Sequence, residues 1–169
     1  IIVHSEGRDI RRGIYRDILP PPNAVHRLES VTKNGDKEPW HVENIADGKR
    51  YYFGKEDVLL PNAKHEYKIH YSISPGLQSH TDNGQLYWNV TGNHWSFPID
   101  RASARVRFPE EVPTDAIQST AYTGVNGSRG TAFSVETNEL SGIFFQTTDI
   151  LDPGEGLTIV VGVEPGYFK

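Results

Sequence analysis

Residues 82–99 read DNGQLYWNVTGNHWSFPI, a run that places two of the three tryptophans, a tyrosine and a phenylalanine between turn residues. The Asn83-Gly84 pair supplies the positive φ angles of a tight turn, and Pro98 disfavours helix at the residue before it. The aromatic residues between these two points favour strand. We therefore predict a buried strand, a tight corner at Gly92 and a second extended piece, and we expect the fold to depend on this run.

Two other segments alternate between apolar and polar residues with a period of two, which is typical of a half-buried strand. In residues 65–73 the odd positions are mostly aromatic or aliphatic, and in residues 101–108 the even positions are apolar. We predict that the odd positions of the first segment face the core and the even positions face water. Residues 157–164 are apolar on both faces, which predicts a central strand.

Shorter strand signals, separated by turn residues, fill much of the remaining chain. They lie at residues 24–32, 40–45, 50–53, 117–123, 131–137 and 142–148. Asp47-Gly48 predicts a hairpin between the second and third of these. No segment has the periodicity of an amphipathic helix. The sequence therefore predicts an all-β fold, an antiparallel β-sandwich of roughly nine or ten strands, immunoglobulin-like or jelly-roll-like.

A chain of 169 residues is long enough for one large domain or two small ones. We predict a single β-sandwich domain over residues 1–169, because each half alone would have a thin core. The alternative is two β domains divided near residues 109–113. No apolar run reaches the ~18 residues of a membrane span, and no signal peptide opens the chain. Since methionine is absent, we expect an excised fragment, with any anchor outside it.

Composition and motifs exclude several classes of function. The net charge of −5 argues against nucleic acid as a partner, and the absence of cysteine excludes disulfides and zinc–thiolate sites. His65 and His70 lie five apart on a predicted strand and so point to opposite faces, unlike the histidines of a zinc-protease helix. The carboxylates at residues 110–111 and 149–155 are more typical of solvated turns than of a glycosidase pair. We predict no metal, no cofactor and no catalytic residue.

Four arginines lie within nine residues of an otherwise acidic chain: Arg8, Arg11, Arg12 and Arg16. The planar guanidinium group suits phosphate, so the first three are candidate ligand-binding residues for lipid headgroups or envelope polymers. Arg16 adjoins Asp17, and we expect it to be held by a carboxylate and to serve the fold. The alternative, which exposed charge runs generally favour, is a solvated turn in which the arginines pair with Asp9 and Asp17.

The two tryptophans of the opening run are the other candidate ligand-binding residues. Trp88 and Trp95 could form a platform on which a sugar ring stacks. Buried aromatic residues dominate β cores, however, so we favour a core position for both. The five histidines outside residues 65–73 are expected at strand ends or on the surface: His4, His26, His41, His80 and His94.

Four segments carry a resemblance to a known family. They are residues 13–18 (GIYRDI), 67–71 (YKIHY), 86–92 (LYWNVTG, with Trp95 and Pro98-Ile99 after it) and 157–162 (LTIVVG). In this order they resemble the bacterial predicted membrane proteins called domain of unknown function 2207. The resemblance implies an extracytoplasmic N-terminal domain that follows a signal peptide and precedes transmembrane helices. No catalytic residues or ligands are established for that family, so none is carried over.

We therefore predict the soluble, outward-facing domain of a bacterial membrane protein, on the extracytoplasmic side of the cell membrane. It would act as a non-catalytic binding or scaffolding module at the cell envelope. An envelope polymer, a lipid headgroup or another membrane protein would be its partner, and nucleic acid would not. The alternative is a carbohydrate-active hydrolase or a carbohydrate-binding module, and a hydrolase would need two loop carboxylates to converge in a cleft.

Overall fold

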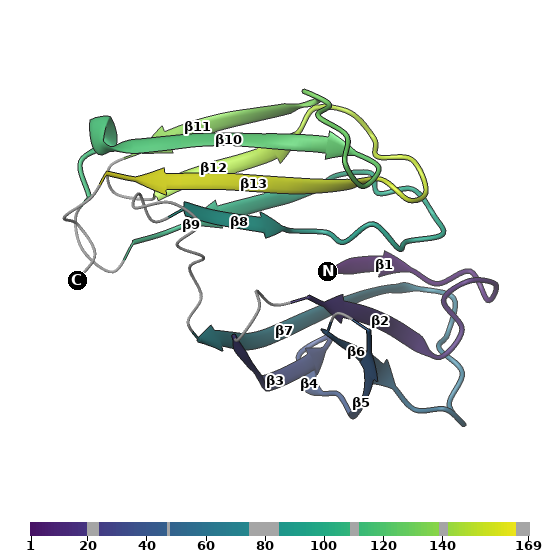
Figure 1. The fold of residues 1–169 in the computed structure, drawn as a ribbon. Coiled ribbons are helices and arrows are strands. Elements are labelled where there is room, and N and C mark those ends of the chain that lie inside the picture. The colour runs from purple at the N-terminus through teal and green to yellow at the C-terminus, as the bar shows by residue number, and fades with distance from the viewer. Residues whose placement is uncertain (20–23, 47, 75–84, 109–111, 139–141, 165–169) are drawn as a thin grey trace. The chain divides into compact units, whose positions relative to one another are not determined.

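The computed structural model describes residues 1–19, 24–46, 48–74, 85–108, 112–138 and 142–164. Within these ranges the chain forms thirteen β-strands and one 3-10 helix, and every strand pairing is antiparallel (Figure 1). The prediction of an all-β, antiparallel fold is confirmed, with more strands than the nine or ten expected. The chain divides into two compact units, residues 1–76 and 77–169. The prediction that residues 1–169 form a single domain stays a prediction.

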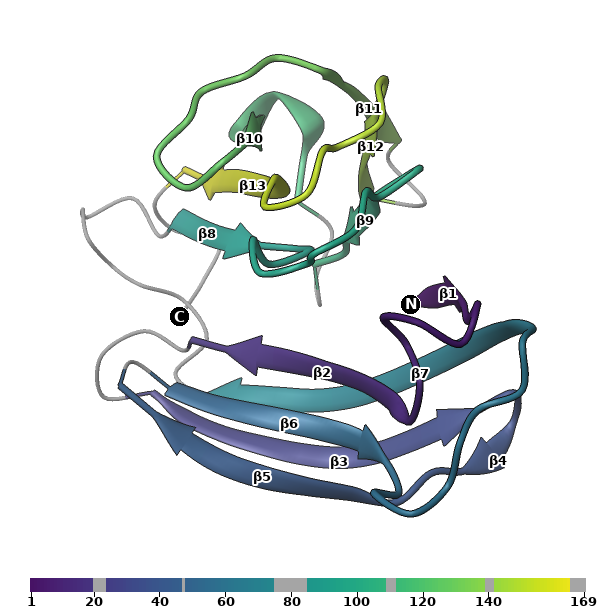
Figure 2. The same ribbon diagram turned by 90° about the vertical axis from the view of Figure 1, so that its right-hand side faces the viewer.

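Unit 1 contains two sheets, of strand orders β1-β7-β3-β4 and β2-β6-β5. The first comprises β1 (Ile2–His4), β7 (Lys64–Ser74), β3 (Val25–Lys33) and β4 (Asp36–Lys37). The second comprises β2 (Gly13–Ile18), β6 (Gly48–Gly54) and β5 (Trp40–Ile45). The sheets pack against each other, since the His26 ring of β3 lies 5.2 Å from the Tyr51 ring of β6 (Figure 2). The predicted hairpin at Asp47-Gly48 is confirmed in β5 and β6, although Asp47 lies outside the described residues.

Strand β7 has the alternation that its sequence predicts. Tyr67 is fully buried, the three later odd positions are half-buried, and the even positions are exposed. Its partner β3 has a bulge between Leu28 and Ser30. A bulge moves the inward positions from one parity to the other, so Leu28 and Val31 both face inward. This is why the sequence of β3 alone gives a mixed pattern.

Unit 2 also contains two sheets, of strand orders β10-β13-β8 and β11-β12-β9. The first comprises β10 (Ile117–Gly124), β13 (Gly156–Val163) and β8 (Gln85–Asn89). The second comprises β11 (Phe133–Asn138), β12 (Gly142–Thr147) and β9 (Ser103–Val106), and the 3-10 helix η1 (Thr114–Ala116) precedes β10. As predicted, β13 is the central strand of its sheet. The apolar core lies between the two sheets and includes Ile143, Phe145, Leu157, Ile159 and Val161.

The run that opens the sequence argument folds differently from its prediction. Strand β8 lies at the edge of its sheet, where Tyr87 is 64% exposed while Leu86 and Trp88 pack against the core, so the strand is buried on one face only. The residues after it form bends rather than a second strand, and only Ile99 bridges to Leu151. The expected turn at residues 82–84 lies outside the described residues. The aromatic residues indicated a buried strand. The prediction failed because the sequence does not show which strand lies at the edge of a sheet.

Candidate functional site

The arginine-rich segment forms a loop that is fixed at several points. We call residues 5–12, between β1 and β2, the arginine loop, and residues 55–63, between β6 and β7, the facing loop. The amide of Ser5 donates to the carbonyl of Ala63 at 2.9 Å, and the amide of Leu60 donates to the carbonyl of Arg11 at 2.8 Å. The Ser5 hydroxyl donates to the Ile10 carbonyl at 2.6 Å, which folds the arginine loop back on itself. The two loops therefore form one continuous surface of unit 1.

Two glycines hold the base of this surface. Gly13 and Gly54 are register partners at the ends of β2 and β6, and both have positive φ angles, +142° and +135°. A Cβ atom on Gly54 would lie 2.1 Å from the Arg12 carbonyl oxygen, and one on Gly13 would lie 1.9 Å from the Phe53 carbonyl oxygen. Only glycine permits so close an approach of the two backbones. The backbone that carries Arg12 is thereby fixed next to the start of the facing loop.

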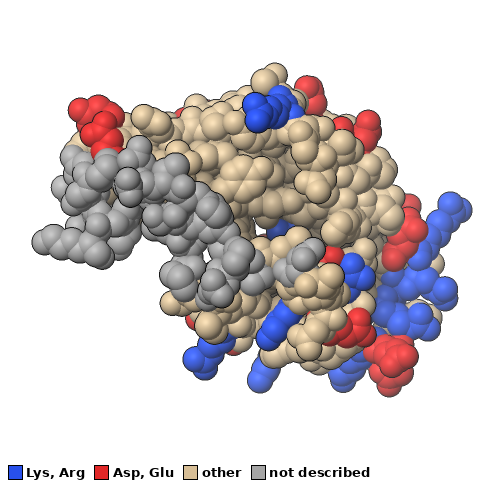
Figure 3. All heavy atoms as spheres, in the orientation of Figure 1, with Lys and Arg blue, Asp and Glu red and all other residues tan. Residues whose placement is uncertain are grey.

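The side chains of Arg8, Arg11 and Arg12 are all exposed, so the structure places three of the five candidate residues on one surface. Figure 3 shows Lys and Arg side chains gathered at the side of unit 1 where the loop between β1 and β2 lies in Figure 1. Acidic side chains are interspersed there, because both loops also carry exposed carboxylates: Glu6, Asp9, Glu56 and Asp57. This surface is therefore mixed in charge, and its three guanidinium groups are exposed.

Arg16 lies apart from these three arginines. It alternates with the buried residues Ile14 and Ile18 of β2 and shares their inward face. Burial lowers the pKa of its guanidinium, and this effect is opposed by Tyr71 and then by Asp17. The carboxylate of Asp17 accepts two hydrogen bonds from Arg50, at 2.6 and 2.8 Å. Arg16 thus lies apart from the exposed arginines, but the carboxylate of Asp17 bonds Arg50, a partner that the sequence did not reveal.

The outer face of the sheet β2-β6-β5 carries a cluster that the sequence did not reveal, which we call the outer-face ladder. One rung aligns the rings of Tyr15, Tyr52 and His41, with Tyr15 to Tyr52 at 6.0 Å and His41 stacked on Tyr52 at 4.6 Å. The next rung aligns Asp17, Arg50 and Glu43 across the same three strands. The guanidinium carbon of Arg50 lies 4.5 Å from the Tyr15 ring centroid, which joins the two rungs.

The ladder's polar groups bond largely to one another. The Tyr52 hydroxyl donates to Glu43 Oε2 at 2.9 Å, and this bond is the main reason that the pKa of Tyr52 is raised. The hydrogen bond to Asp17 raises the pKa of Arg50 further above its ordinary value. Cross-strand pairs of this kind stabilise a sheet. We therefore interpret the ladder as a set of cross-strand contacts that stabilises the three-stranded sheet.

The two candidate tryptophans lie in different settings in unit 2. Trp88 of β8 is opposite Ile159 and packs against the apolar core. Trp95 lies in the loop after β8, where its Nε1 donates to the Thr91 carbonyl at 2.8 Å and its ring lies 5.3 Å from Phe97. Both side chains are half-buried. Trp88 thus packs on the core, the position favoured for both tryptophans, whereas Trp95 contacts the corner after β8; the alternative of a sugar-stacking platform is not tested.

Residues 89–93 fix that corner by hydrogen bonds to distant loops. The Asn93 amide donates to the carbonyls of Gly124 and Gly154, at 3.0 and 3.3 Å. The Thr91 hydroxyl accepts a hydrogen bond from the amide of Leu157 at 2.9 Å. Asn89 donates to Asn93 Oδ1 at 2.6 Å. Residues 88–93 (WNVTGN) therefore connect the first strand of unit 2 to the beginning of β13. This agrees with the expectation that the fold depends on this run.

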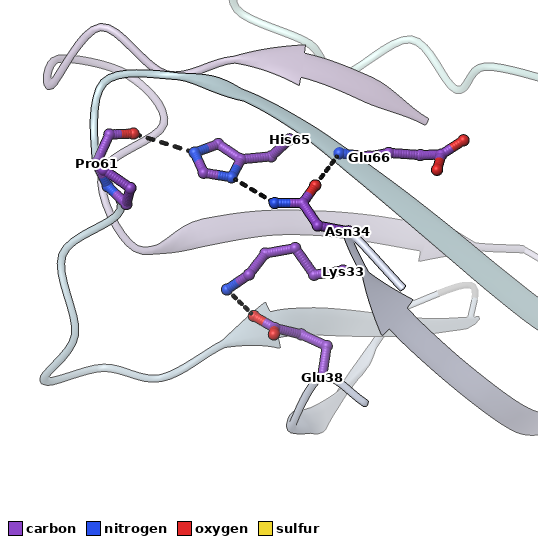
Figure 4. A network of polar contacts seen from close by, with 6 residues as sticks. All are labelled: Lys33, Asn34, Glu38, Pro61, His65 and Glu66. Carbon is purple, nitrogen blue, oxygen red and sulfur yellow. Dashed lines mark hydrogen bonds and ion pairs between the residues drawn. The ribbon is translucent and has the colours of Figure 1, made fainter. Parts of the chain in front are cut away.

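His65 and His70 point to opposite faces of β7, as predicted. His70 is exposed, whereas His65 is buried in a polar network at one end of unit 1 (Figure 4). Because a carbonyl only accepts, His65 Nε2 donates to Pro61 at 3.0 Å, which leaves Nδ1 to accept from Asn34 at 3.5 Å. Among the described residues, no group of three or more His, Cys, Asp or Glu side chains could hold a metal ion.

A partly buried ion pair lies beside this histidine. Lys33 Nζ lies 2.9 Å from Glu38 Oε1, and the Glu38 side chain is almost fully buried. Burial, together with the charge of Glu38, raises the pKa of Tyr67 to about 12. Asn34 joins the turn between β3 and β4 to His65 and to the amide of Glu66 in β7, and Lys33 pairs with Glu38 across that turn, so we interpret the network as structural.

Comparison with known proteins assigns the chain to a family of membrane proteins. The chain belongs to the family described as predicted membrane protein (DUF2207) N-terminal domain, which matches residues 3–163. The resemblance of the four sequence segments is thereby confirmed.

Among curated proteins, the chain is similar to the uncharacterized protein YciQ of Escherichia coli (strain K12), with 29% identity over 135 residues. The match covers 74% of this chain and 21% of YciQ, so the chain spans about a fifth of that relative's length. No solved structure matches the chain. In the part of the chain that the structure describes, no helix is long and apolar enough to cross a membrane.

Proposed function

We propose that this domain is a non-catalytic binding module on the extracytoplasmic side of a bacterial membrane protein, and that its arginine loop binds phosphate groups of the cell envelope. The membership of a membrane-protein family supports a place next to a membrane. The observation that carries the proposal is the exposure of Arg8, Arg11 and Arg12 on one loop whose backbone is fixed to the facing loop.

A fixed backbone favours binding because less conformational freedom is lost when the ligand is engaged. The guanidinium group presents its donors in a planar fork that matches two phosphate oxygens. An envelope phosphate offers such oxygens whether it belongs to a lipid headgroup or to a polymer. Each engaged arginine contributes about 1 kcal/mol near an anionic surface. Three of them give a weak site, which suits a domain that is held at the membrane by the rest of its protein.

The test is co-sedimentation of the domain with vesicles that contain anionic and zwitterionic lipid in equal parts. We expect binding at low salt that weakens as salt rises, because the Debye length falls from about 30 Å at 0.01 M to about 8 Å at physiological ionic strength. Replacement of Arg8, Arg11 and Arg12 together by glutamine is expected to weaken binding at low salt to the level that the parent retains at high salt, with little change in the melting temperature.

The matched control removes three exposed arginines from unit 2: Arg101, Arg107 and Arg129. This control changes the net charge by the same amount, so it separates a local site from a general charge effect. Vesicle binding by the control variant should equal that of the parent. Equal binding by the parent and the arginine-loop variant would contradict the proposal, as would a parent that does not bind.

A further inference from the structure

We infer that the phosphate groups bound by the arginine loop are those of a lipid bilayer, and that Val58 and Leu59 of the facing loop insert into that bilayer. This inference rests on the proposed function and names the partner at the same site. Val58 and Leu59 are consecutive aliphatic residues with exposed fractions of 46% and 58%. Neither of the two loops contains another exposed large hydrophobic residue.

The backbone contacts show where this apolar pair lies. Gly54 is paired with Gly13 on one side of it, and the amide of Leu60 donates to the carbonyl of Arg11 on the other. Residues 55–59 therefore leave the sheet next to Arg12 and return next to Arg11. The amide of Val58 donates to the carbonyl of Lys55 at 3.3 Å, which closes a turn within this projection. Leu60 is buried and anchors its end.

This combination has the chemistry of a surface that contacts a bilayer. Moving aliphatic side chains from water to the boundary between headgroups and acyl chains is favourable in free energy, and guanidinium groups remain at the level of the phosphates. A hydrophilic polymer of the envelope offers phosphate to the arginines but nothing to Val58 and Leu59. The apolar pair therefore distinguishes the two sources of phosphate.

The charges near the apolar pair limit the part of the binding that electrostatic attraction can supply. Glu56 and Asp57 directly precede Val58, so the local charge is not strongly positive and attraction by charge alone is limited. Insertion of aliphatic groups is not screened by salt, whereas contacts between exposed charges are. A bilayer-bound loop should therefore retain part of its affinity at a salt concentration that removes all binding to a phosphate polymer.

The experiment measures affinity for vesicles of phosphatidylglycerol and phosphatidylethanolamine in equal parts, and for soluble polyphosphate, at 0.05 M and 0.5 M salt. We expect the parent to keep measurable vesicle binding at 0.5 M salt and to lose polyphosphate binding there. Replacement of Val58 and Leu59 together by serine should weaken vesicle binding by at least about tenfold, and leave polyphosphate binding at low salt unchanged. The matched control replaces Val125 and Ile150, which are similarly exposed in unit 2, by serine.

A second variant reports insertion directly. In Leu59→Trp, vesicles should shift the added tryptophan emission to the blue, and brominated lipid should quench it, relative to the parent spectrum. If the V58S/L59S variant binds vesicles like the parent while the arginine-loop variant does not, the inference is wrong and the proposed function stands. If the arginine-loop variant binds vesicles and polyphosphate like the parent, the proposed function itself is wrong. An unchanged emission of Leu59→Trp on vesicles that the protein binds also overturns the inference.

Discussion

The two units bury different chemistry between their sheets. In unit 2 the space is filled by aliphatic and aromatic side chains, and hydrogen-bonding side chains are concentrated at the corner after β8. In unit 1 the inward faces also carry Arg16, His26 and Tyr51, and a partly buried ion pair lies near one end. An apolar core depends mainly on the area that it removes from water, whereas a mixed core depends on each polar group having a partner. The units should therefore respond to different perturbations.

The largest effect is expected from truncation in the apolar core of unit 2. Phe145 is fully buried between the two sheets, so Phe145→Ala removes a ring and leaves a cavity. We expect a loss of about 3–5 kcal/mol in the free energy of unfolding. Denaturant unfolding followed by the emission of Trp88 and Trp95 measures it, in a Trp40→Phe background that silences unit 1. The conservative change Ile143→Val should cost only about 1 kcal/mol, and equal losses in the two variants would argue against a tightly packed core.

A smaller effect is expected from the outer-face ladder of unit 1. The side chain of Asp17 is 8% exposed and that of Arg50 is 31% exposed, and two hydrogen bonds join them. Asp17→Asn should lower the free energy of unfolding by about 1–2 kcal/mol, because the charge-assisted pair is lost in a partly desolvated position. A double-mutant cycle with Arg50→Met measures the coupling between the two side chains.

The control for this cycle is the exposed ion pair of Lys68 and Glu66, whose atoms lie 3.6 Å apart. Pairs of that kind contribute about 0–1 kcal/mol. A coupling energy between Asp17 and Arg50 no larger than that of the control pair would show that the ladder does not stabilise the sheet beyond ordinary surface contacts.

The smallest effect concerns pH and His26. Burial lowers the pKa of His26 below its ordinary value of 6.5, and the charge of Lys49 lowers it further. The unfolded chain therefore takes up this proton at a higher pH than the folded chain does. Stability from the neutral ring is fully present above pH 6.5 and is lost as pH falls below that value towards the folded pKa.

Thermal melts of the parent and of His26→Gln between pH 8 and pH 5 measure this contribution. The parent should lose more melting temperature than the variant over that range, because the other histidines titrate in both proteins. At pH 8 the variant should be less stable, since the hydrogen bond between Tyr51 Oη and His26 Nδ1, 3.0 Å long, is changed. Identical pH dependence in the two proteins would mean that His26 is charged as readily in the folded chain as in the unfolded one.

Much of the fold could be read from local patterns. Strand β7 and the β5–β6 hairpin depend on alternation and on a turn within the hairpin, which are local properties. Arg16 was separated from the exposed arginines because it adjoins Asp17, and the burial alternation of Ile14, Arg16 and Ile18 in β2 gives the physical reason for its inward position. Strand β3 could be read only in part, because its bulge reverses the inward parity at Glu29.

The rest depends on pairings between distant segments. The outer-face ladder forms only when β2 pairs with β6, and the sequence of neither segment indicates with which strand it pairs. Tyr87 is exposed because β8 became an edge strand, which is a property of the whole sheet. Val58 and Leu59 gain significance only through the contact between Leu60 and Arg11. Sequence could show that these residues are apolar, but not that arginines lie next to them.

The order of strands in unit 2 also constrains how the domain is made in the cell. Strand β13 lies between β10 and β8 in space, yet both of these neighbours precede it in the chain. Both β8 and β10 are synthesised before β13, the strand that joins them in the sheet. The corner at Thr91 is also incomplete until β13 is synthesised, because the Thr91 hydroxyl accepts a hydrogen bond from the amide of Leu157. The sheet can therefore close only after residues 156–163 have emerged from the ribosome, and until then β8 and β10 lack the backbone partners that this strand provides.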